Sequence, residues 1–552
     1  MANNQTNSIP STPIWQNWSG NLVHKPASDG KEYYKAPTNL TGLQQVIANV
    51  KKEKGATLRV SGQRHSQPPL VADDNRDSVP QTTSEYLVDM SCYADLGTNN
   101  DQRIVLGPEK NQVTVNTGVR EDELDAFLTA NNLMMKTVTA GGFFSLGGMT
   151  AVDVHGATID ASIFAQDISA FNIMLADGNV MTINEQTPMF PFGHLYMTWM
   201  PLQFARVSLG GLGIVTSVIL NVLERPFATT LQGGTERLTI KDKAGFIKNF
   251  KPFLEKYDRV ETFFTPYAAP WGLSNFLVLW WDVVNNPPVK IPNIVSVPDN
   301  ACTLANKKPP EYGAPYLQGI AQFGSYLAEK SQYYDWADNP IAGPAVITAV
   351  GRDVIEKDGA AANLAHSDLW LNGAVAVIFM SYFIPLPKLD DDGLGKVWDS
   401  MDLVTKLVLP NGHFHIAAPM EFRFVKGGNS TMSGAFAFSN TGDTWFVNQD
   451  LIAFVEPNLK ASQYPAKLLK FFADVERKWV GMGGFPHNGK MYGFYDPTDA
   501  PGTYSASGPF NPNFLAELRT RRGLPLEAFK AYRETLDPNG LFYNKYLRQL
   551  LE

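Results

Sequence analysis

The segment Thr57-Leu-Arg-Val-Ser-Gly-Gln-Arg-His-Ser66 decides how the first part of this chain is organised. Its first half is predicted to form a short strand, which ends abruptly in a polar glycine turn that carries His65. Just upstream, apolar residues recur at helical spacing over residues 43–50, and Thr41-Gly-Leu-Gln44 has the pattern of a capping box. We therefore predict a helix, a strand and then a histidine-bearing turn.

Further glycine turns follow predicted strands downstream. Residues 113–117 are predicted as a strand that ends at Gly118, a glycine-rich segment covers residues 139–150, and Gly210-Gly-Leu-Gly213 leads into the β-rich run 214–222. Glycine lets backbone N–H groups approach an anion closely, so several such turns could together hold a pyrophosphate. Glycines that merely turn the chain are the alternative, and the histidine in the first turn favours a binding site.

Several common enzyme motifs are incomplete or absent in this sequence. Gly210-Gly-Leu-Gly213 resembles part of a dinucleotide-binding fingerprint, but β-branched residues follow it where a helix is required. Residues 484–490 match the spacing of a phosphate-binding loop, yet Met491 stands where a Ser or Thr hydroxyl must bind magnesium. The chain also lacks Gly-x-Ser-x-Gly and His-Glu-x-x-His motifs, so a serine hydrolase or zinc protease has no primary support.

Composition narrows the function classes further. The 552 residues include 46 Lys and Arg against 54 Asp and Glu, a net charge of −8 without basic stripes, which argues against nucleic-acid binding. Cys92 and Cys302 are too few and too far apart for a metal cluster, and we predict no metal site. The longest apolar run, residues 373–384, is too short to span a membrane and is predicted as a buried strand. No signal peptide is evident, so we expect a cytoplasmic protein or a mature secreted form.

Three segments of the first half together resemble a known family. Arg59–Ser66, the glycine-rich segment ending in His155-Gly156, and Gly211–Thr216 look like the FAD-binding domain of the vanillyl-alcohol oxidase/PCMH superfamily. In covalent members of that superfamily the histidine of the Gly-x-x-His-Ser turn is bonded to the flavin, and here that position is His65. Some members attach FAD a second time through a cysteine just before the glycine-rich segment, but this sequence has Thr137-Val-Thr139 there, so the resemblance implies a single histidyl bond.

The second half carries matching motifs from one branch of that superfamily. Glu421-Phe-Arg423 and Pro486-His-Asn-Gly-Lys490 resemble motifs of the aldonolactone oxidase and type II cholesterol oxidase branch, with Asn488 replacing a tryptophan. The segment Asp537–Phe542 matches its C-terminal signature. The resemblance is weak between residues 227 and 410.

This resemblance implies an α+β fold with two lobes. We expect a PCMH-type FAD-binding domain over residues 1–225, a substrate domain over 226–490 with a large antiparallel sheet covered by helices, and a segment 491–552 that returns to the FAD domain. The flavin should lie between the lobes. The residues expected to bind FAD are Ser61, Gly62, Gln63, Arg64, His65, Ser66, Gly141, Gly142, Gly147, Gly148, His155, Gly156, Gly213, Ile214, Val215 and Asn544.

Candidate catalytic residues come from the second half. Glu421 and Arg423 alternate on a predicted strand and so share a face, where a cation would stabilise developing negative charge. Glu421 would orient Arg423 or take the hydroxyl proton, although an ordinary ion pair is the alternative. His487 offers a second base and Lys490 a second cation, unless Lys490 is only a solvated turn residue. Glu261, in an aromatic stretch, is a further candidate base or gate.

We therefore predict oxidation of an alcohol to a carbonyl by hydride transfer to covalent FAD, with O2 reduced to H2O2. A bulky apolar, sterol-like substrate is favoured because the middle of the chain is aromatic and carries few charges. An alditol or sugar-lactone oxidase or dehydrogenase is the alternative within the superfamily. A flavin-less protein that binds a hydrophobic ligand is the alternative of another class.

Overall fold

The computed structural model describes residues 15–26, 29, 31–77, 84–193, 197–225, 231–267, 274–283, 347, 355–356, 377–408, 414–416, 418–438, 444–453, 455, 459–500 and 508–552. Trp271, Cys302 and the proline-rich segments 285–298 and 307–315 lie outside these residues. Among the described helices, none is both long enough and apolar enough to cross a bilayer.

The predicted helix, strand and turn are present at the start of the first lobe. Helix α1 (Leu40–Val50) precedes β4 (Thr57–Ser61), which joins β5 (Glu85–Asp89) and β3 (Tyr34–Lys35) in a parallel sheet ordered β3-β5-β4. The predicted capping box at Thr41 is wrong. The N-cap is two residues earlier, at Asn39, whose side chain accepts a hydrogen bond from the Gly42 N–H at 2.9 Å.

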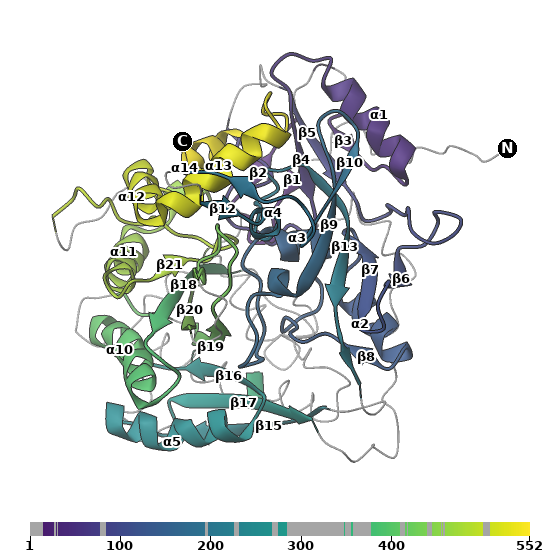
Figure 1. Ribbon diagram of the computed structural model, residues 1–552. Helices are drawn as coiled ribbons and strands as arrows, with labels where there is room; N and C mark the ends of the chain where they lie inside the picture. The colour runs from purple at the N-terminus through teal and green to yellow at the C-terminus, as the bar shows by residue number, and fades with distance from the viewer. Residues whose placement is uncertain are drawn as a thin grey trace, which may run out of the picture.

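A five-stranded antiparallel sheet forms the rest of this lobe (Figure 1). Its order is β10-β9-β13-β7-β6, and Asp177-Gly178, a dipeptide typical of β-hairpin turns, joins β9 to β10. The strand that follows Gly213 is β13, which confirms that this glycine turn does not open a helix. The bounds are β6 Ile104–Leu106, β7 Gln112–Asn116, β9 Ile168–Met174, β10 Val180–Asn184 and β13 Ile214–Asn221, with helices α2 Glu121–Ala130, α3 Leu146–Ala151 and α4 Pro201–Ala205.

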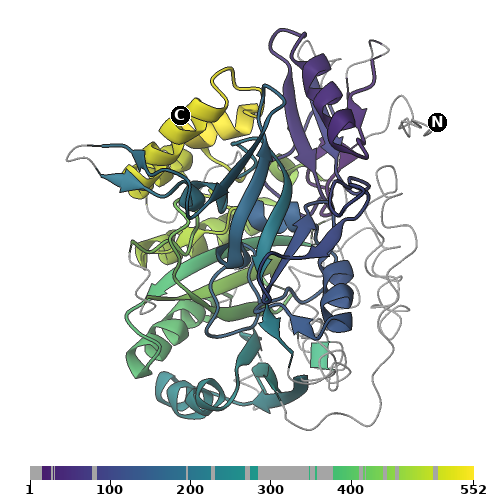
Figure 2. The same ribbon diagram turned by 45° about the vertical axis from the view of Figure 1, so that its right-hand side comes forward.

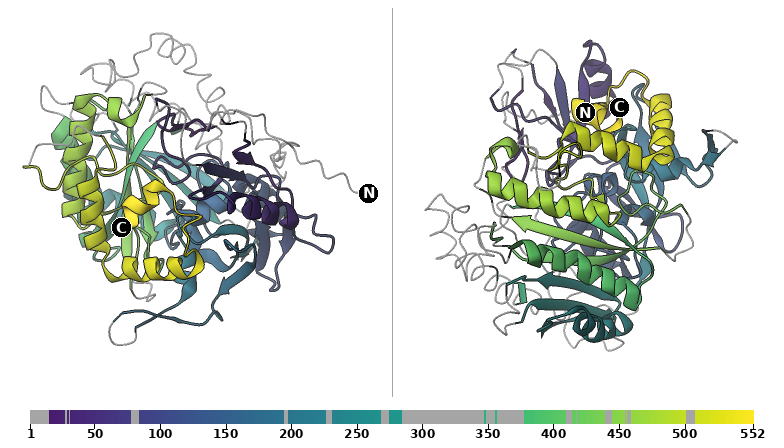
Figure 3. Two further views of the ribbon diagram at one scale, coloured as in Figure 1. Left: turned by 90° about the horizontal axis from the view of Figure 1, so that it is seen from above. Right: turned by 90° about the vertical axis from the view of Figure 1, so that its left-hand side faces the viewer.

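The second lobe contains a seven-stranded antiparallel sheet ordered β15-β17-β16-β19-β20-β18-β21. Helices α5 (Lys243–Lys256), α10 (Asp391–Val408) and α11 (Ala466–Gly481) lie side by side over one face of it (Figure 3). This confirms the α+β class and the large helix-covered sheet. The strands are β15 Leu231–Leu238, β16 Arg259–Phe264, β17 Phe276–Val283, β18 Ile378–Leu386, β19 Met420–Lys426, β20 Trp445–Ala453 and β21 Phe485–Pro486.

Strand β18 contains the described part of the longest apolar run. It begins at Ile378 and continues through Pro385 to Leu386, and residues 373–376 lie outside the described residues. Proline is tolerated there because β21 pairs only with Tyr382 and Phe383, so Pro385 has a neighbouring strand on one side alone.

Residues 537–547 return to the first lobe and pack beside β4, as the yellow and purple segments show in Figures 1 and 2. The Leu58 N–H donates to the Leu541 carbonyl at 2.8 Å. The buried Arg59 guanidinium donates to four carbonyls, those of Leu70 (2.8 Å), Leu209 (2.6 Å), Gly210 (2.7 Å) and Phe542 (2.7 Å). Helices α12 (Pro512–Arg522), α13 (Leu524–Leu536) and α14 (Lys545–Leu551) complete this region. The domain limits near residues 225 and 490 remain predictions.

Candidate active site

One cavity of about 310 Å³ is lined by residues from both lobes. The first lobe contributes its glycine turns, and the second contributes one face of β19 and β20 and the turn after β21. The predicted site residues that line it are Ser61, Gly62, Gln63, Arg64, His65, Ser66, Gly141, Gly147, Gly148, His155, Gly213, Val215, Glu421, Arg423, His487 and Lys490.

Four of the predicted cofactor residues do not line this cavity. A Cβ at Gly156 would overlap the Val138 carbonyl, so glycine is required there for packing. Ile214 is fully buried in β13, and the Gly142 N–H donates to Thr139 Oγ1 at 3.1 Å. Asn544 caps α14 by accepting from the Leu547 N–H at 3.0 Å. Sequence alone could not separate these supporting positions from lining ones, because both lie in the same short motifs.

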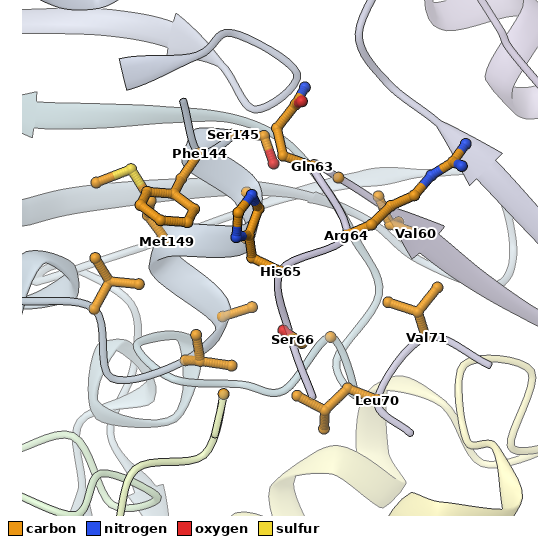
Figure 4. A pocket seen from close by; sticks show the side chains of 18 of the residues that line it. Val60, Gln63, Arg64, His65, Ser66, Leu70, Val71, Phe144, Ser145 and Met149 are labelled. Atoms are coloured by element: carbon orange, nitrogen blue, oxygen red, sulfur yellow. The ribbon is translucent and has the colours of Figure 1, made fainter. Parts of the chain in front are cut away.

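The turn after β4 holds His65 against three aromatic rings. The imidazole stacks between Trp18 and Phe143, with ring centroids 5.0 Å and 5.2 Å away, and Phe144 meets it edge-on at 4.7 Å. Arg64 has a left-handed backbone (φ 63°), and its side chain points away from His65 (Figure 4). Burial, and then the nearby Lys490 cation, lower the pKa of His65 well below its usual value. The ring is therefore neutral at pH 7 and retains a nucleophilic lone pair.

These residues fit FAD. Glycines of several turns line the first-lobe part of the cavity, namely Gly62, Gly118, Gly141, Gly210 and Gly213. Glycine lets backbone N–H groups approach a pyrophosphate closely. A Cβ at Gly62 would overlap Ser145 Oγ, so a larger residue there would have to displace that hydroxyl. The same cavity brings His65 together with the charged residues of the second lobe. The chain thus provides a groove for phosphates, an aromatic-flanked histidine for a ring, and charged groups beyond it.

The charged face centres on Arg423. Its Nη2 lies 2.8 Å from Glu261 Oε1 and also contacts Glu421 Oε1, because β19 lies between β16 and β20 and places these side chains together. The three side chains are only 2–12% exposed. Burial raises the pKa of Glu421 to about 7, against the opposing effect of Arg423. Glu261 does not line the cavity; it contacts the site through Arg423.

The turn after β21 presents His487 and Lys490. The Gly489 N–H donates to His487 Nδ1 at 2.9 Å, so the neutral ring carries its proton on Nε2. Burial, and then Lys490, lower the pKa of His487 to about 3. His487 is therefore a hydrogen-bond donor in this geometry, although the sequence suggested a base. The Lys490 ammonium lies 3.7 Å from the centre of the Phe379 ring.

Buried Asp153, which the sequence did not single out, holds this turn in place. Its carboxylate accepts from the Asn488 N–H (2.8 Å), the Asn488 Nδ2 (2.6 Å) and the Gly434 N–H (2.9 Å). Asn488, which replaces the tryptophan of the family motif, thus joins the two lobes through its hydrogen bonds to Asp153. Sequence reasoning also missed Trp18 and Asp450, and the only signal for Asp450 was a carboxylate within a largely apolar strand.

Comparisons with known proteins agree with this architecture. The D-arabinono-1,4-lactone oxidase family model matches residues 362–550. Bovine (Bos taurus) L-gulonolactone oxidase is 23% identical over 97% of this chain and 98% of its own length. L-gulono-1,4-lactone dehydrogenase of Mycobacterium tuberculosis is 25% identical over 98% of this chain and 99% of its own length. The match to mouse (Mus musculus) L-gulonolactone oxidase, 25% identical, covers only 40% of this chain and 43% of that protein.

Solved structures show the same fold over the whole chain. A solvent-stable cholesterol oxidase has a TM-score of 0.68 at 16% identity, with 100% of both chains covered. Cholesterol oxidase from B. sterolicum has a TM-score of 0.67 at 14% identity, with 100% of this chain and 99% of that one covered. Through the family match in its second half and the fold that it shares with cholesterol oxidases, the chain is similar to FAD-dependent oxidoreductases of the PCMH-type superfamily.

Proposed function

We propose that this protein oxidises a hydroxyl group of a sugar lactone or a closely related polyol to a carbonyl. The observation that carries the proposal is the charged end of the cavity, where Glu421, Arg423, Asp450 and Lys490 face the same space. Hydroxyl groups can donate to the carboxylates and accept from the cations. A sterol offers a single hydroxyl group to these charges, and its apolar rings would leave the other buried polar groups without hydrogen bonds, which is costly.

The relatives support the same substrate class. The curated proteins that match are named for gulonolactone and arabinonolactone, and the family model that matches is named for an arabinonolactone. The cholesterol oxidases share the fold at 14–16% identity, which carries no information on substrate. The sugar-lactone alternative is therefore favoured over the sterol-like alcohol.

The chain's own residues have separate tasks in this reaction. Bound FAD supplies the two-electron oxidant that accepts hydride from the carbinol carbon. Arg423 holds the substrate oxygen and stabilises the negative charge that develops on it. Glu261 and Glu421 fix the Arg423 guanidinium from two sides, and His487 Nε2 and Lys490 add hydrogen-bond donors.

Anaerobic flavin bleaching tests the substrate class. Holoprotein is mixed with aldonolactones, alditols and cholesterol, and flavin absorbance is followed in a stopped-flow instrument. We expect the lactones or alditols to reduce the flavin and cholesterol to leave it oxidised. Reduction by cholesterol alone would refute the proposal. Readmitting air and measuring peroxide then separates an oxidase, which we expect, from a dehydrogenase that needs another acceptor.

We further propose that His65 carries the flavin covalently. The neutral, aromatic-flanked imidazole supports this bond, and His65→Ala is expected to release all FAD into the supernatant on acid precipitation. Wild-type protein should keep its flavin in the pellet and show a fluorescent band on a denaturing gel. His415→Ala, at a half-buried histidine that does not line the cavity, is the matched control and should retain the flavin. Retention of flavin in the His65 variant would place the bond elsewhere.

A further inference from the structure

Asp450 is a buried carboxylate whose position sets it apart from the other acids of the site. It lies on β20 directly opposite Glu421 on β19 and Ser381 on β18, and its side chain lines the cavity. The residue is 8% exposed, and within the described part of the chain its Oδ1 has no hydrogen-bond partner. A buried carboxylate oxygen without a donor costs free energy, so a donor from a ligand would stabilise it.

The other candidate bases are occupied or weak. Glu261 and Glu421 both contact Arg423 Nη2, so each carboxylate already has a cation as its partner. His487 Nδ1 already accepts from the Gly489 N–H. Burial lowers the pKa of His155 well below its usual value, which makes its neutral ring a poor proton acceptor.

Lys490 supplies the complementary charge across the cavity. No carboxylate of the residues described here lies within 4 Å of its ammonium, although Asp450 and Glu421 both act on it electrostatically. A single hydroxyl group can donate to Asp450 and accept from Lys490 at the same time. An alcohol placed between them would therefore satisfy both ions.

We propose that Asp450 is the catalytic proton acceptor, a role that rests on the proposed oxidation of a hydroxyl group. The substrate O–H bond breaks and its proton passes to the Asp450 carboxylate. The carbon–hydrogen bond breaks as hydride, and both electrons go to the oxidised flavin that the proposed function supplies. Lys490 and Arg423 stabilise the oxygen while its proton leaves.

The charged groups around Asp450 predict how the rate depends on pH. Burial, and then Glu421 on β19, raise the pKa of Asp450 to about 6, while Lys490, Ser381 on β18 and Arg423 oppose the shift. Proton acceptance requires the ionised form. The rate of flavin reduction should therefore be low below pH 6, rise through about pH 6, and level off above it.

Asp450→Asn removes the basicity and keeps the size of the side chain. With an aldonolactone that reduces wild-type holoprotein, flavin reduction in this variant should fall about 100-fold at pH 8, with unchanged flavin content and melting temperature. The rise near pH 6 should disappear. Asp399→Asn, at an exposed carboxylate of α10 paired with Lys243, is the matched control and should behave as wild type. Glu421→Gln should keep this rise but shift it to lower pH, because it removes the charge that helps raise the pKa of Asp450.

The outcomes separate the two proposals. If no lactone or polyol reduces wild-type flavin, the proposed function fails, and the role of Asp450 fails with it. If the wild type is reduced and Asp450→Asn is reduced equally fast, only the role of Asp450 is refuted. Loss of the pH 6 limb in Glu421→Gln instead would assign the base to Glu421. Infrared spectroscopy offers a second test. If the Asp450 carboxyl group, identified by a band that Asp450→Asn lacks, stays protonated up to pH 9, the role of Asp450 is also refuted.

Discussion

Replacing Arg423 by alanine is expected to lower the rate of flavin reduction about 100- to 1000-fold, the usual effect of losing one preorganised donor to a developing negative charge. The guanidinium contacts both Glu261 and Glu421, and it also reaches the His155 carbonyl at 3.4 Å. Without it, two neighbouring buried carboxylates would lose the cation that they share. Their pKa values should rise until one or both take up a proton.

Arg423→Lys separates the loss of the positive charge from the loss of the contact with both glutamates. Lysine keeps one positive charge but cannot hold the flat, two-sided contact with both glutamates. We expect the rate of flavin reduction in Arg423→Lys to lie between those of Arg423→Ala and the wild type. Its melting temperature should be close to that of the wild type. Lys426→Ala, in the same strand but paired with Asp160 at the surface, is the control and should leave the rate unchanged. A wild-type rate in Arg423→Ala would show that the charge cluster serves only the fold.

Arg59→Met is expected to lower the free energy of unfolding by about 4 kcal/mol, because four carbonyls lose a charge-assisted donor in a buried place. Methionine fills much of the volume, so the loss reports on the hydrogen bonds. Burial lowers the pKa of Arg59 to about 10, which still leaves the side chain charged at neutral pH. The measurement is urea unfolding at equal flavin loading.

The control for this variant is Arg519→Met. Arg519 is a half-buried arginine whose solvent-exposed side-chain hydrogen bond goes to a single carbonyl, that of Gln549. Its replacement should cost well under 1 kcal/mol, as for most exposed polar contacts. Equal unfolding midpoints for the two variants would contradict the assignment of Arg59 as the residue that ties the distant segments together.

Local features were predictable from the sequence because they depend on nearby residues. The strand and turn at residues 57–66, the hairpin at Asp177-Gly178 and the shared face of Glu421 and Arg423 all follow from short patterns and hold in the structure. Asp153, Asp450 and Trp18 were missed because their roles arise only when segments that are separate in the sequence come together in the fold.

The preference for an apolar substrate had a different physical origin. It rested on the aromatic residues between positions 261 and 281, which the sequence could not assign to a pocket or to a core. Phe264, Phe276 and Trp281 are at most 3% exposed and pack within the protein. Phenylalanine and tryptophan fill cores more often than they line sites. The aromatic stretch therefore says little about the ligand.

The return of residues 541–544 to β4 also has a consequence during synthesis. Arg59 is made early, yet one of its carbonyl partners, that of Phe542, lies 483 positions later. During synthesis the N-terminal lobe therefore lacks this hydrogen bond until the segment that contains Phe542 has left the ribosome exit tunnel. Flavin capture should thus be a post-translational event, and ribosome-stalled chains that stop before residue 540 should acquire no yellow colour.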